Sequence, residues 1–206
     1  MTNIIKFTKE KIQALFVECP DKVHGFDHAE RVAVHATYIA KEEGEDVLMS
    51  TLAGLLHDIG RAIEKYPEKF PEYDSKKTHH ELSYDMLQTW FREESIFSGL
   101  TDDQKIELLY AVRYHWNDEA CEYPSAYILR DADKIDGLGD IGMRRHRIHC
   151  SDDEQLYILD IRLRYEWLYN FKTKTAQRMY EEMDLMVPFE KERTKILKEL
   201  IKPIEL

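Results

Sequence analysis

The sequence predicts an all-α fold, a bundle of helices within one domain. Glycine and proline are sparse, with 8 and 6 copies in 206 residues, and apolar residues recur at the spacing of amphipathic helices. No linker, repeat or low-complexity tract divides the chain, and its length suffices for one substantial core. We therefore expect a single domain over residues 1–206, with core motifs at about 20–147 and a helical tail at about 152–201.

The N-terminal part of the chain predicts two helices. A short first helix ends before Pro20 and is indicated by three apolar residues, Ile12, Leu15 and Phe16. A second helix begins at Asp27, where Asp27 and Glu30 form a variant of the capping box, and it ends near Gly44. Its buried face is expected to hold Val32, Ala36, Ile39 and Ala40.

A third helix over 47–60 is predicted by four leucines, Leu48, Leu52, Leu55 and Leu56. Its last turn delivers His57 and Asp58. Residues 62–77 are interrupted by Pro67 and Pro71 and predict a loop, either a lid over a cleft or a solvated connector.

Helices are predicted next over 79–92, 102–116 and 123–136. One more amphipathic stripe consists of Leu156, Leu159, Leu163 and Trp167. A methionine stripe, Met179, Met183 and Met186, indicates either core or a subunit contact, and we therefore include a homodimer among the expectations. A final helix over 188–201 starts with Pro188.

Composition and charge restrict the class of function. The net charge of −11 argues against broad nucleic-acid binding, which needs a positive surface. No apolar run approaches the roughly 20 residues that span a bilayer, and no signal peptide is recognised, so we expect a cytoplasmic protein without a membrane partner. The odd number of cysteines, three, fits a reducing compartment.

The most informative residues are two histidines and two aspartates. His57 and Asp58 directly follow the apolar run 52–56, His28 follows an acidic residue, and Asp133 belongs to the acidic segment 131–133. Buried imidazoles and carboxylates need a partner or a metal, and this mixed nitrogen and oxygen set suits a divalent cation. The sequence therefore predicts a metal held by His28, His57, Asp58 and Asp133.

Three segments together resemble the HD-domain superfamily of metal-dependent phosphohydrolases, in its small single-domain bacterial form. They are Asp27-His-Ala-Glu-Arg-Val32, Leu55-Leu-His-Asp-Ile-Gly60 and Arg130-Asp-Ala-Asp-Lys-Ile-Asp136, in that order. The resemblance implies the HD-domain helical bundle and the same four metal ligands. It covers residues 20–147 and extends more loosely into 170–176.

The resemblance also implies further site residues. His80, in His80-Glu-Leu-Ser83, and His115 match positions that hold a second metal in some members and contact substrate in others. Asp136 and Glu64 are the candidates for the general acid or base, because Arg61 stands where some HD nucleotidases carry a glutamate. The expected catalytic set is therefore Asp58, His80, His115 and Asp136.

Three basic residues are expected to bind substrate phosphate, namely Arg61, Lys134 and Arg145. Arg145 ends the segment 136–145, in which the resemblance implies a glycine-rich turn before the arginine. We expect His24 to lie on the rim of the cleft and His79 to be an exposed polar residue.

The function expected from these residues is hydrolysis of a small phosphorylated molecule, first of all a nucleotide. One divalent metal is expected, with manganese favoured over magnesium, iron, nickel or zinc. Two alternatives stay open. Six ligands, with His80 and His115 included, could hold two irons as in HD-fold oxygenases, or the chain could be a non-catalytic module that senses a nucleotide.

Overall fold

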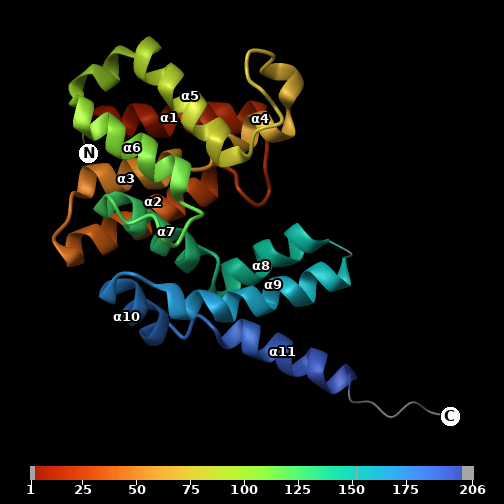
Figure 1. Cartoon of the computed structure of the whole chain (residues 1–206). Coiled ribbons are helices and arrows are strands. Elements are labelled where there is room, and N and C mark those ends of the chain that lie inside the picture. Colours follow the sequence, from red (N-terminus) through yellow and green to blue (C-terminus); the bar gives the residue numbers. More distant parts are fainter. Residues whose placement is uncertain (1–2, 152, 201–206) are drawn as a thin grey trace.

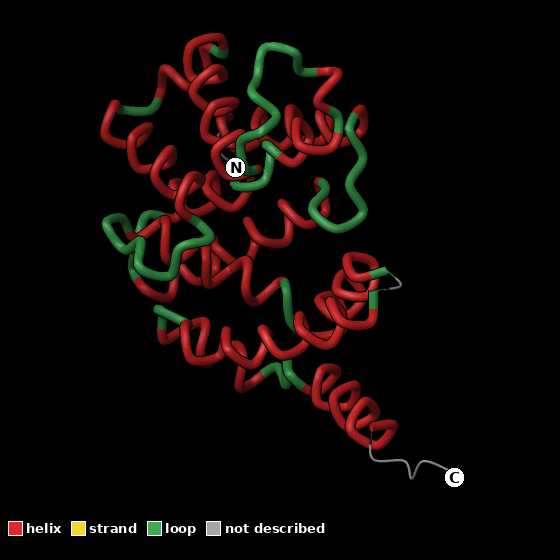
Figure 2. Tube along the Cα trace, turned by 45° about the vertical axis from the view of Figure 1, so that its right-hand side comes forward, coloured by secondary structure: helices red, strands yellow, loops and turns green. Residues whose placement is uncertain are grey.

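The computed structural model describes residues 3–151 and 153–200, and in these ranges the chain forms helices and no strand (Figures 1 and 2). The all-α prediction is confirmed. The α-helices are α1 (Asn3–Glu18), α2 (Phe26–Glu43), α3 (Val47–Leu56), α4 (Arg61–Lys65), α5 (His79–Glu93), α6 (Asp102–Tyr114), α7 (Pro124–Asp136), α8 (Gly139–Cys150), α9 (Glu154–Trp167), α10 (Lys174–Glu182) and α11 (Val187–Leu200). Short 3-10 turns are η1 (Pro67–Lys69), η2 (Ser95–Gly99) and η3 (Leu168–Asn170).

The centre of the molecule is formed by α2, α3 and α7, which pack against one another. Helix α3 is apolar on all sides, as expected for a helix enclosed by others, and from Met49 to Leu56 every residue is buried. Helices α1 and α6 cover α3, and α5 lies against α6 and α4 (Figure 1). This arrangement surrounds the end of α3 with other helices and so encloses His57 and Asp58.

The C-terminal helices form a second layer below the central one in Figure 1. Helix α8 packs on α9 and α11, whereas α10 contacts α2 and α7. The predicted glycine-rich turn at 136–145 is wrong for most of its length, because α8 begins at Gly139. The φ of Gly139, 66°, lies in the left-handed region, which glycine adopts without strain. Of the predicted tail, residues 152 and 201 lie outside the described residues.

The start of α2 differs from the predicted capping box. Gly25 is the N-cap, and Asp27 lies in the first turn with its side chain 91% exposed. A Cβ atom at position 25 would lie 2.3 Å from the backbone oxygen of Asp21, so the close turn before α2 requires glycine there. The predicted stop at Gly44 is confirmed, with φ 77°.

Helix α3 ends four residues earlier than predicted. It stops at Leu56, and His57 caps it. The predicted loop at 62–77 is wrong at its start, because α4 follows within a few residues and buries Ala62 and Ile63. The short turn between α3 and α4 therefore carries His57 and Asp58 on rigid backbone.

Most of the predicted apolar stripe of α9 does not face the core, although Trp167 packs against it. Leu156, Leu159 and Leu163 are 36%, 51% and 37% exposed, whereas Asp160 and Ile161 are buried. In the methionine stripe, Met179 and Met186 are buried and Met183 is exposed. Among the described residues, no helix combines the length and the apolar character needed to cross a membrane.

Candidate metal centre and its cavity

Four side chains from three parts of the fold converge behind the end of α3. His28 comes from the first turn of α2, His57 and Asp58 from the turn after α3, and Asp133 from the last turn of α7. The Nε2 atom of His28 lies 3.1 Å from Nε2 of His57, 3.4 Å from Oδ1 of Asp133 and 3.7 Å from Oδ2 of Asp58. The structure thus groups three of the four predicted ligands, His28, His57 and Asp58, with potential ligand atoms within 4.8 Å of one another. Asp133 lies beside this group through its contact with His28.

Hydrogen bonds orient both imidazoles toward one point. Nδ1 of His57 donates to the backbone oxygen of Gly54 at 2.8 Å, and Nδ1 of His28 donates to Oδ2 of Asp136 at 2.7 Å. A neutral imidazole carries one N–H, so two Nε2 lone pairs face each other at 3.1 Å. Oδ1 of Asp58 is also buried without a hydrogen-bond partner. A divalent cation would satisfy the two nitrogens, and the donor set fits one, whereas Oδ1 of Asp58 faces His79 and His115.

The protonation states agree with metal binding. Burial lowers the pKa of His28 and favours its neutral form. Burial alone would raise the pKa of Asp58, but the neighbouring His57 and His24 hold it well below its usual value. For Asp133, His28 and His57 likewise outweigh burial and lower the pKa. A neutral His28 beside ionised carboxylates is in the form that binds metals.

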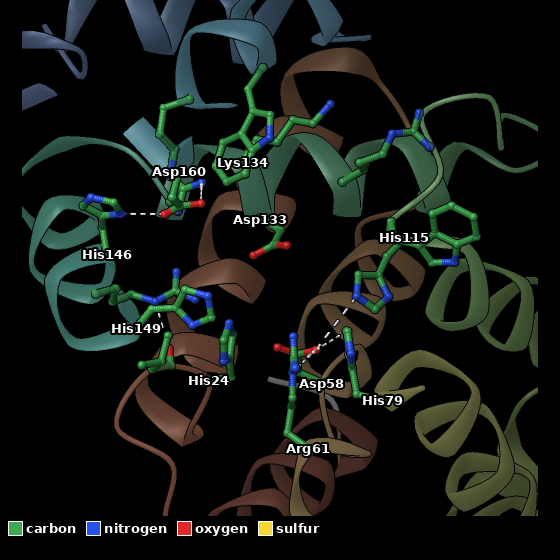
Figure 3. A pocket seen from close by; sticks show the side chains of 18 of the residues that line it. His24, Asp58, Arg61, His79, His115, Asp133, Lys134, His146, His149 and Asp160 are labelled. Carbon is green, nitrogen blue, oxygen red and sulfur yellow. Dashed lines mark hydrogen bonds and ion pairs between the residues drawn. The ribbon is translucent and has the colours of Figure 1, made fainter. Parts of the chain in front are cut away.

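Asp58 also faces a second pair of imidazoles. Its Oδ1 lies 3.6 Å from Nε2 of His79 and 3.8 Å from Nε2 of His115, and both rings turn toward the carboxylate (Figure 3). Nδ1 of His115 donates to the backbone oxygen of Val112 at 2.7 Å, which leaves its Nε2 as an acceptor. Burial lowers the pKa of His115 to about 4 and that of His79 to about 3. Asp58 is therefore shared by two groups of potential ligands.

The neighbour of Asp58 on α5 is His79 rather than His80. His79 is not the exposed polar residue expected, since its side chain is only 19% exposed. The cause lies at Gly60, where a Cβ atom would come within 2.1 Å of the backbone oxygen of His79, so the turn after Asp58 packs directly on the start of α5. His80 turns away, with Nε2 2.8 Å from Oγ1 of Thr78.

Asp136 lies behind the ligands rather than in the cavity. Besides His28, its carboxylate contacts Nε of Arg31 and Nη1 of Arg145, both at 2.6 Å. Although burial opposes it, these partners lower the pKa of Asp136 far below its usual value. With both oxygens occupied, Asp136 is placed to orient His28. The other acid-base candidate, Glu64, pairs with Arg61 at 2.8 Å.

A cavity of about 350 Å³ opens in front of Asp58 (Figure 3). Several cationic side chains line it, namely Arg61, Arg130, Lys134, Arg145 and Arg164. The three predicted phosphate-binding residues are thus brought together, and His24 joins them. Four carboxylates, those of Asp58, Asp118, Asp133 and Asp160, line the same cavity, so it combines cationic groups that could contact an anion with carboxylates that could hold a cation.

Sequence reasoning missed several lining residues, Arg130 and Asp160 among them, whereas Lys134 was predicted. Arg130 and Lys134 both contact Oδ1 of Asp118, at 3.2 and 2.5 Å. Across the cavity from His115, Asp160 pairs with His146 (Figure 3). Only the helical spacing of Arg130 and Lys134, four residues apart, was a signal that the sequence offered.

A family model describing the HD domain matches residues 25–138, more than half of the chain. Among curated relatives, Ribonuclease Y 2 of Pediococcus pentosaceus is 31% identical over 111 residues, which are 54% of this chain and 18% of that protein. The chain spans less than a fifth of the length of the curated relatives it matches.

Solved structures share the fold along almost the whole chain. A predicted HD superfamily hydrolase from an uncultured Thermotogales bacterium has a TM-score of 0.65 and 22% identity, covering 95% of this chain and 92% of that one. YpgQ of Bacillus subtilis, solved in complex with ADP, has a TM-score of 0.65 and 19% identity, with coverage of 98% and 97%. At these identities the likeness shows the fold.

Proposed function

Because the chain belongs to the HD-domain family, we propose that it is a divalent-metal-dependent phosphohydrolase that acts on a small phosphorylated molecule, with a nucleotide favoured. The observation that carries this proposal is the convergence of His28, His57, Asp58 and Asp133 beside a cation-lined cavity. The ADP complex of YpgQ and the relatives named Ribonuclease Y support a phosphate-bearing substrate.

The four converging residues would hold the cation, and manganese is favoured over magnesium, iron, nickel or zinc. When bound, a divalent cation lowers the pKa of water and neutralises phosphate charge. Asp136 keeps the proton of His28 on Nδ1, so that Nε2 stays available as a ligand atom. Its role in this proposal is to position His28 rather than to transfer protons.

The cavity residues act on the substrate. Arg61, whose Nε lies 3.7 Å from Oδ1 of Asp58, is placed to contact a phosphoryl group at the metal. Arg145 and Lys134 add positive charge on the α7–α8 side. His115 presents Nε2 as an acceptor toward the reacting group, because its Nδ1 proton is engaged by Val112. Such preorganised charges stabilise the negative charge of a transition state.

We propose one tightly bound ion, with His79 and His115 facing the substrate. The shared position of Asp58 makes a second ion, held by Asp58, His79 and His115, the specific alternative. Two ions would be required for the oxygenase alternative. A chain that binds a nucleotide without turnover would be the sensing module.

Metal analysis combined with a substrate screen tests the proposal. The protein is purified without chelators, the metal per chain is measured, and phosphate or pyrophosphate release is followed over a panel of nucleotides and sugar phosphates. We expect one equivalent of metal and release that chelation abolishes. Full metal occupancy without release from any phosphorylated compound would contradict hydrolysis, and two irons with oxygen consumption would establish the oxygenase.

A further inference from the structure

Trp116 is a large aromatic side chain left in solvent at the cavity. It lines the same cavity as Asp58, follows His115 directly, and is 59% exposed. The chain has two other tryptophans. Trp90 is 8% exposed, and Trp167, although it lines the cavity, carries the guanidinium of Arg164 4.0 Å from its ring centroid. Trp116 is therefore the tryptophan with accessible aromatic surface at the site.

A buried arginine, Arg130, anchors the turn that follows Trp116. Arg130 is buried, and its Nη1 donates to the backbone oxygens of Asn117, at 2.5 Å, and Ala120, at 3.0 Å. Asn117 also accepts through Oδ1 from the backbone N–H of Glu119 at 3.0 Å. An anchored turn lowers the entropic cost of binding through its side chains, and these hydrogen bonds hold the backbone that directly follows Trp116.

The imidazole ring of His80 packs beside Trp116. The imidazole of His80 lies 5.5 Å from the Trp116 ring, centroid to centroid, at an interplanar angle of 32°, a tilted and partly stacked arrangement. His80 in turn lies 6.1 Å from the His115 ring. His115 and Trp116 thus line the cavity, and the His80 ring, which does not line it, lies beside both.

We propose that Trp116 stacks on the base of the bound nucleotide and so determines that the substrate carries a base. This inference rests on the proposed phosphohydrolase function. A planar aromatic base matches the exposed indole face, and base–aromatic stacking tolerates every base because each has a π-face. The cationic residues Arg61 and Arg145 then contact the phosphate end.

Paired ligands that differ only in the nucleoside test this inference. Binding of adenosine 5′-(α,β-methylene)diphosphate and of methylenediphosphonate is measured by calorimetry on the metal-loaded protein, for the wild type, Trp116→Ala and Trp116→Phe. For Trp116→Ala we expect binding of the nucleotide analogue to weaken roughly 5- to 150-fold, the range for one lost base stack. Binding of methylenediphosphonate should stay within about twofold, and Trp116→Phe should restore most of the affinity for the nucleotide analogue.

The matched control is Tyr169→Ala, which removes an 88% exposed aromatic ring that does not line the cavity. It should bind both ligands like the wild type. Unchanged nucleotide affinity in Trp116→Ala, or equal weakening for both ligands, would overturn the stacking role and leave Trp116 as a general surface contact. The proposed hydrolysis is judged separately, by phosphate release from the wild type, so the two failures are distinguishable.

Discussion

At His28 a single imidazole ring joins two environments with different chemistry. Its Nε2 faces His57 and the two ligand carboxylates, whereas its Nδ1 contacts Asp136 at 2.7 Å. Because an imidazole has only two nitrogens, occupation of one side by a carboxylate decides what the other side can bind. The charge of Asp136 is in turn compensated by Arg31 and Arg145, so a chain of contacts three residues deep supports one ligand atom.

Asp136→Asn tests whether this carboxylate positions His28 or takes part in proton transfer. We expect the variant to bind metal about 10- to 100-fold more weakly, the usual effect of losing the partner of a ligating histidine. At saturating metal, most of kcat should return and the pH profile of kcat/KM should keep its shape. A fall in kcat that metal does not rescue, with loss of one limb of the profile, would instead identify Asp136 as the acid or base.

The sequence was sufficient to find the four candidate ligands but not their surroundings. His57 and Asp58 directly follow a fully apolar run, which is a local signal that burial needs compensation. The choice between His79 and His80 depends on how closely Gly60 approaches α5, and adjacent residues in a sequence carry no information on such packing. The contacts of Asp136 with Arg31, more than a hundred residues away, are likewise tertiary.

At the scale of elements, the site is built from helix ends. His57 caps α3, His79 begins α5 and His115 caps α6. At the ends of α3 and α6, the backbone oxygens of Gly54 and Val112 accept from Nδ1 of the capping histidine and so turn both Nε2 atoms toward Asp58. Helix termini thus determine the direction of the ligand lone pairs.

The start of α5 provides a test with a built-in control, since His79 and His80 are adjacent. We expect His79→Ala to lower kcat/KM at least about tenfold, because it removes an imidazole 3.6 Å from Oδ1 of Asp58. His80→Ala should have a smaller effect on kcat, because Nε2 of His80 is bonded to Thr78. Steady-state kinetics and metal content of both variants check this. A larger loss of kcat in His80→Ala would contradict the assignment.

A buried ion cluster joins α8 to α9. Asp160 of α9 contacts Nδ1 of His146 at 2.5 Å and Nη2 of Arg164 at 2.8 Å. Burial would raise the pKa of Asp160, but the hydrogen bond from His146 and the charges of Arg164 and the nearby His149 lower it overall. An aspartate with a lowered pKa stabilises the folded state above its unfolded pKa, and this stability is lost as the pH falls through the folded value.

Asp160→Asn should therefore destabilise the protein by about 1–3 kcal/mol at pH 7, and the difference from the wild type should shrink as the pH falls below about 4, near the unfolded pKa of aspartate. Urea unfolding at pH 7, 5 and 3.5 measures it. Glu166→Gln, which alters an exposed pair with Arg162 on the same helix, should change little. A difference that does not depend on pH would show that Asp160 acts by packing alone.

Element prediction failed where glycine or burial misled it. Three glycines at 137, 139 and 142 suggested a turn, yet of these three only Gly139 has a positive φ. Gly142 instead allows a close approach within the helical segment, since a Cβ atom there would lie 2.2 Å from the backbone of Gly137. On α9, periodicity identified the helix but not its buried face, since buried Asp160 pairs with its neighbours. Apolar periodicity gives the spacing of a helix, but ion pairs between helices can place a charged residue on its buried face, as Asp160 shows.

At the scale of the whole molecule, the cavity lies between the central helices and the C-terminal layer. Asp58, His79 and His115 come from the turn after α3, the start of α5 and the end of α6, and Arg145 and Arg164 come from α8 and α9. In this strongly acidic chain, five cationic side chains and four carboxylates therefore meet at one cavity. The family resemblance covers residues 20–147 and therefore predicted only part of the cavity lining, because the lining residues of α9 lie outside its motifs.

Metal removal should destabilise the whole molecule, because the candidate ligands join α2, the turn after α3 and α7. A ligand that binds only the folded state at 1,000 times its Kd stabilises by about 4 kcal/mol, which for a domain of this size corresponds to roughly 8–16 °C in Tm. We expect such a difference between manganese-loaded protein and protein treated with a chelator, measured by thermal unfolding followed by circular dichroism. In Asp58→Ala the two conditions should give the same Tm, because His28, His57 and Asp133 without the shared carboxylate of Asp58 hold a divalent ion weakly. Asp27→Ala is the matched control, since this carboxylate also adjoins a ligand histidine but is exposed, and it should keep the full difference. If the chelator shifted Asp58→Ala as much as the wild type, the stabilising ion would lie elsewhere, and the proposed centre would lose its structural role.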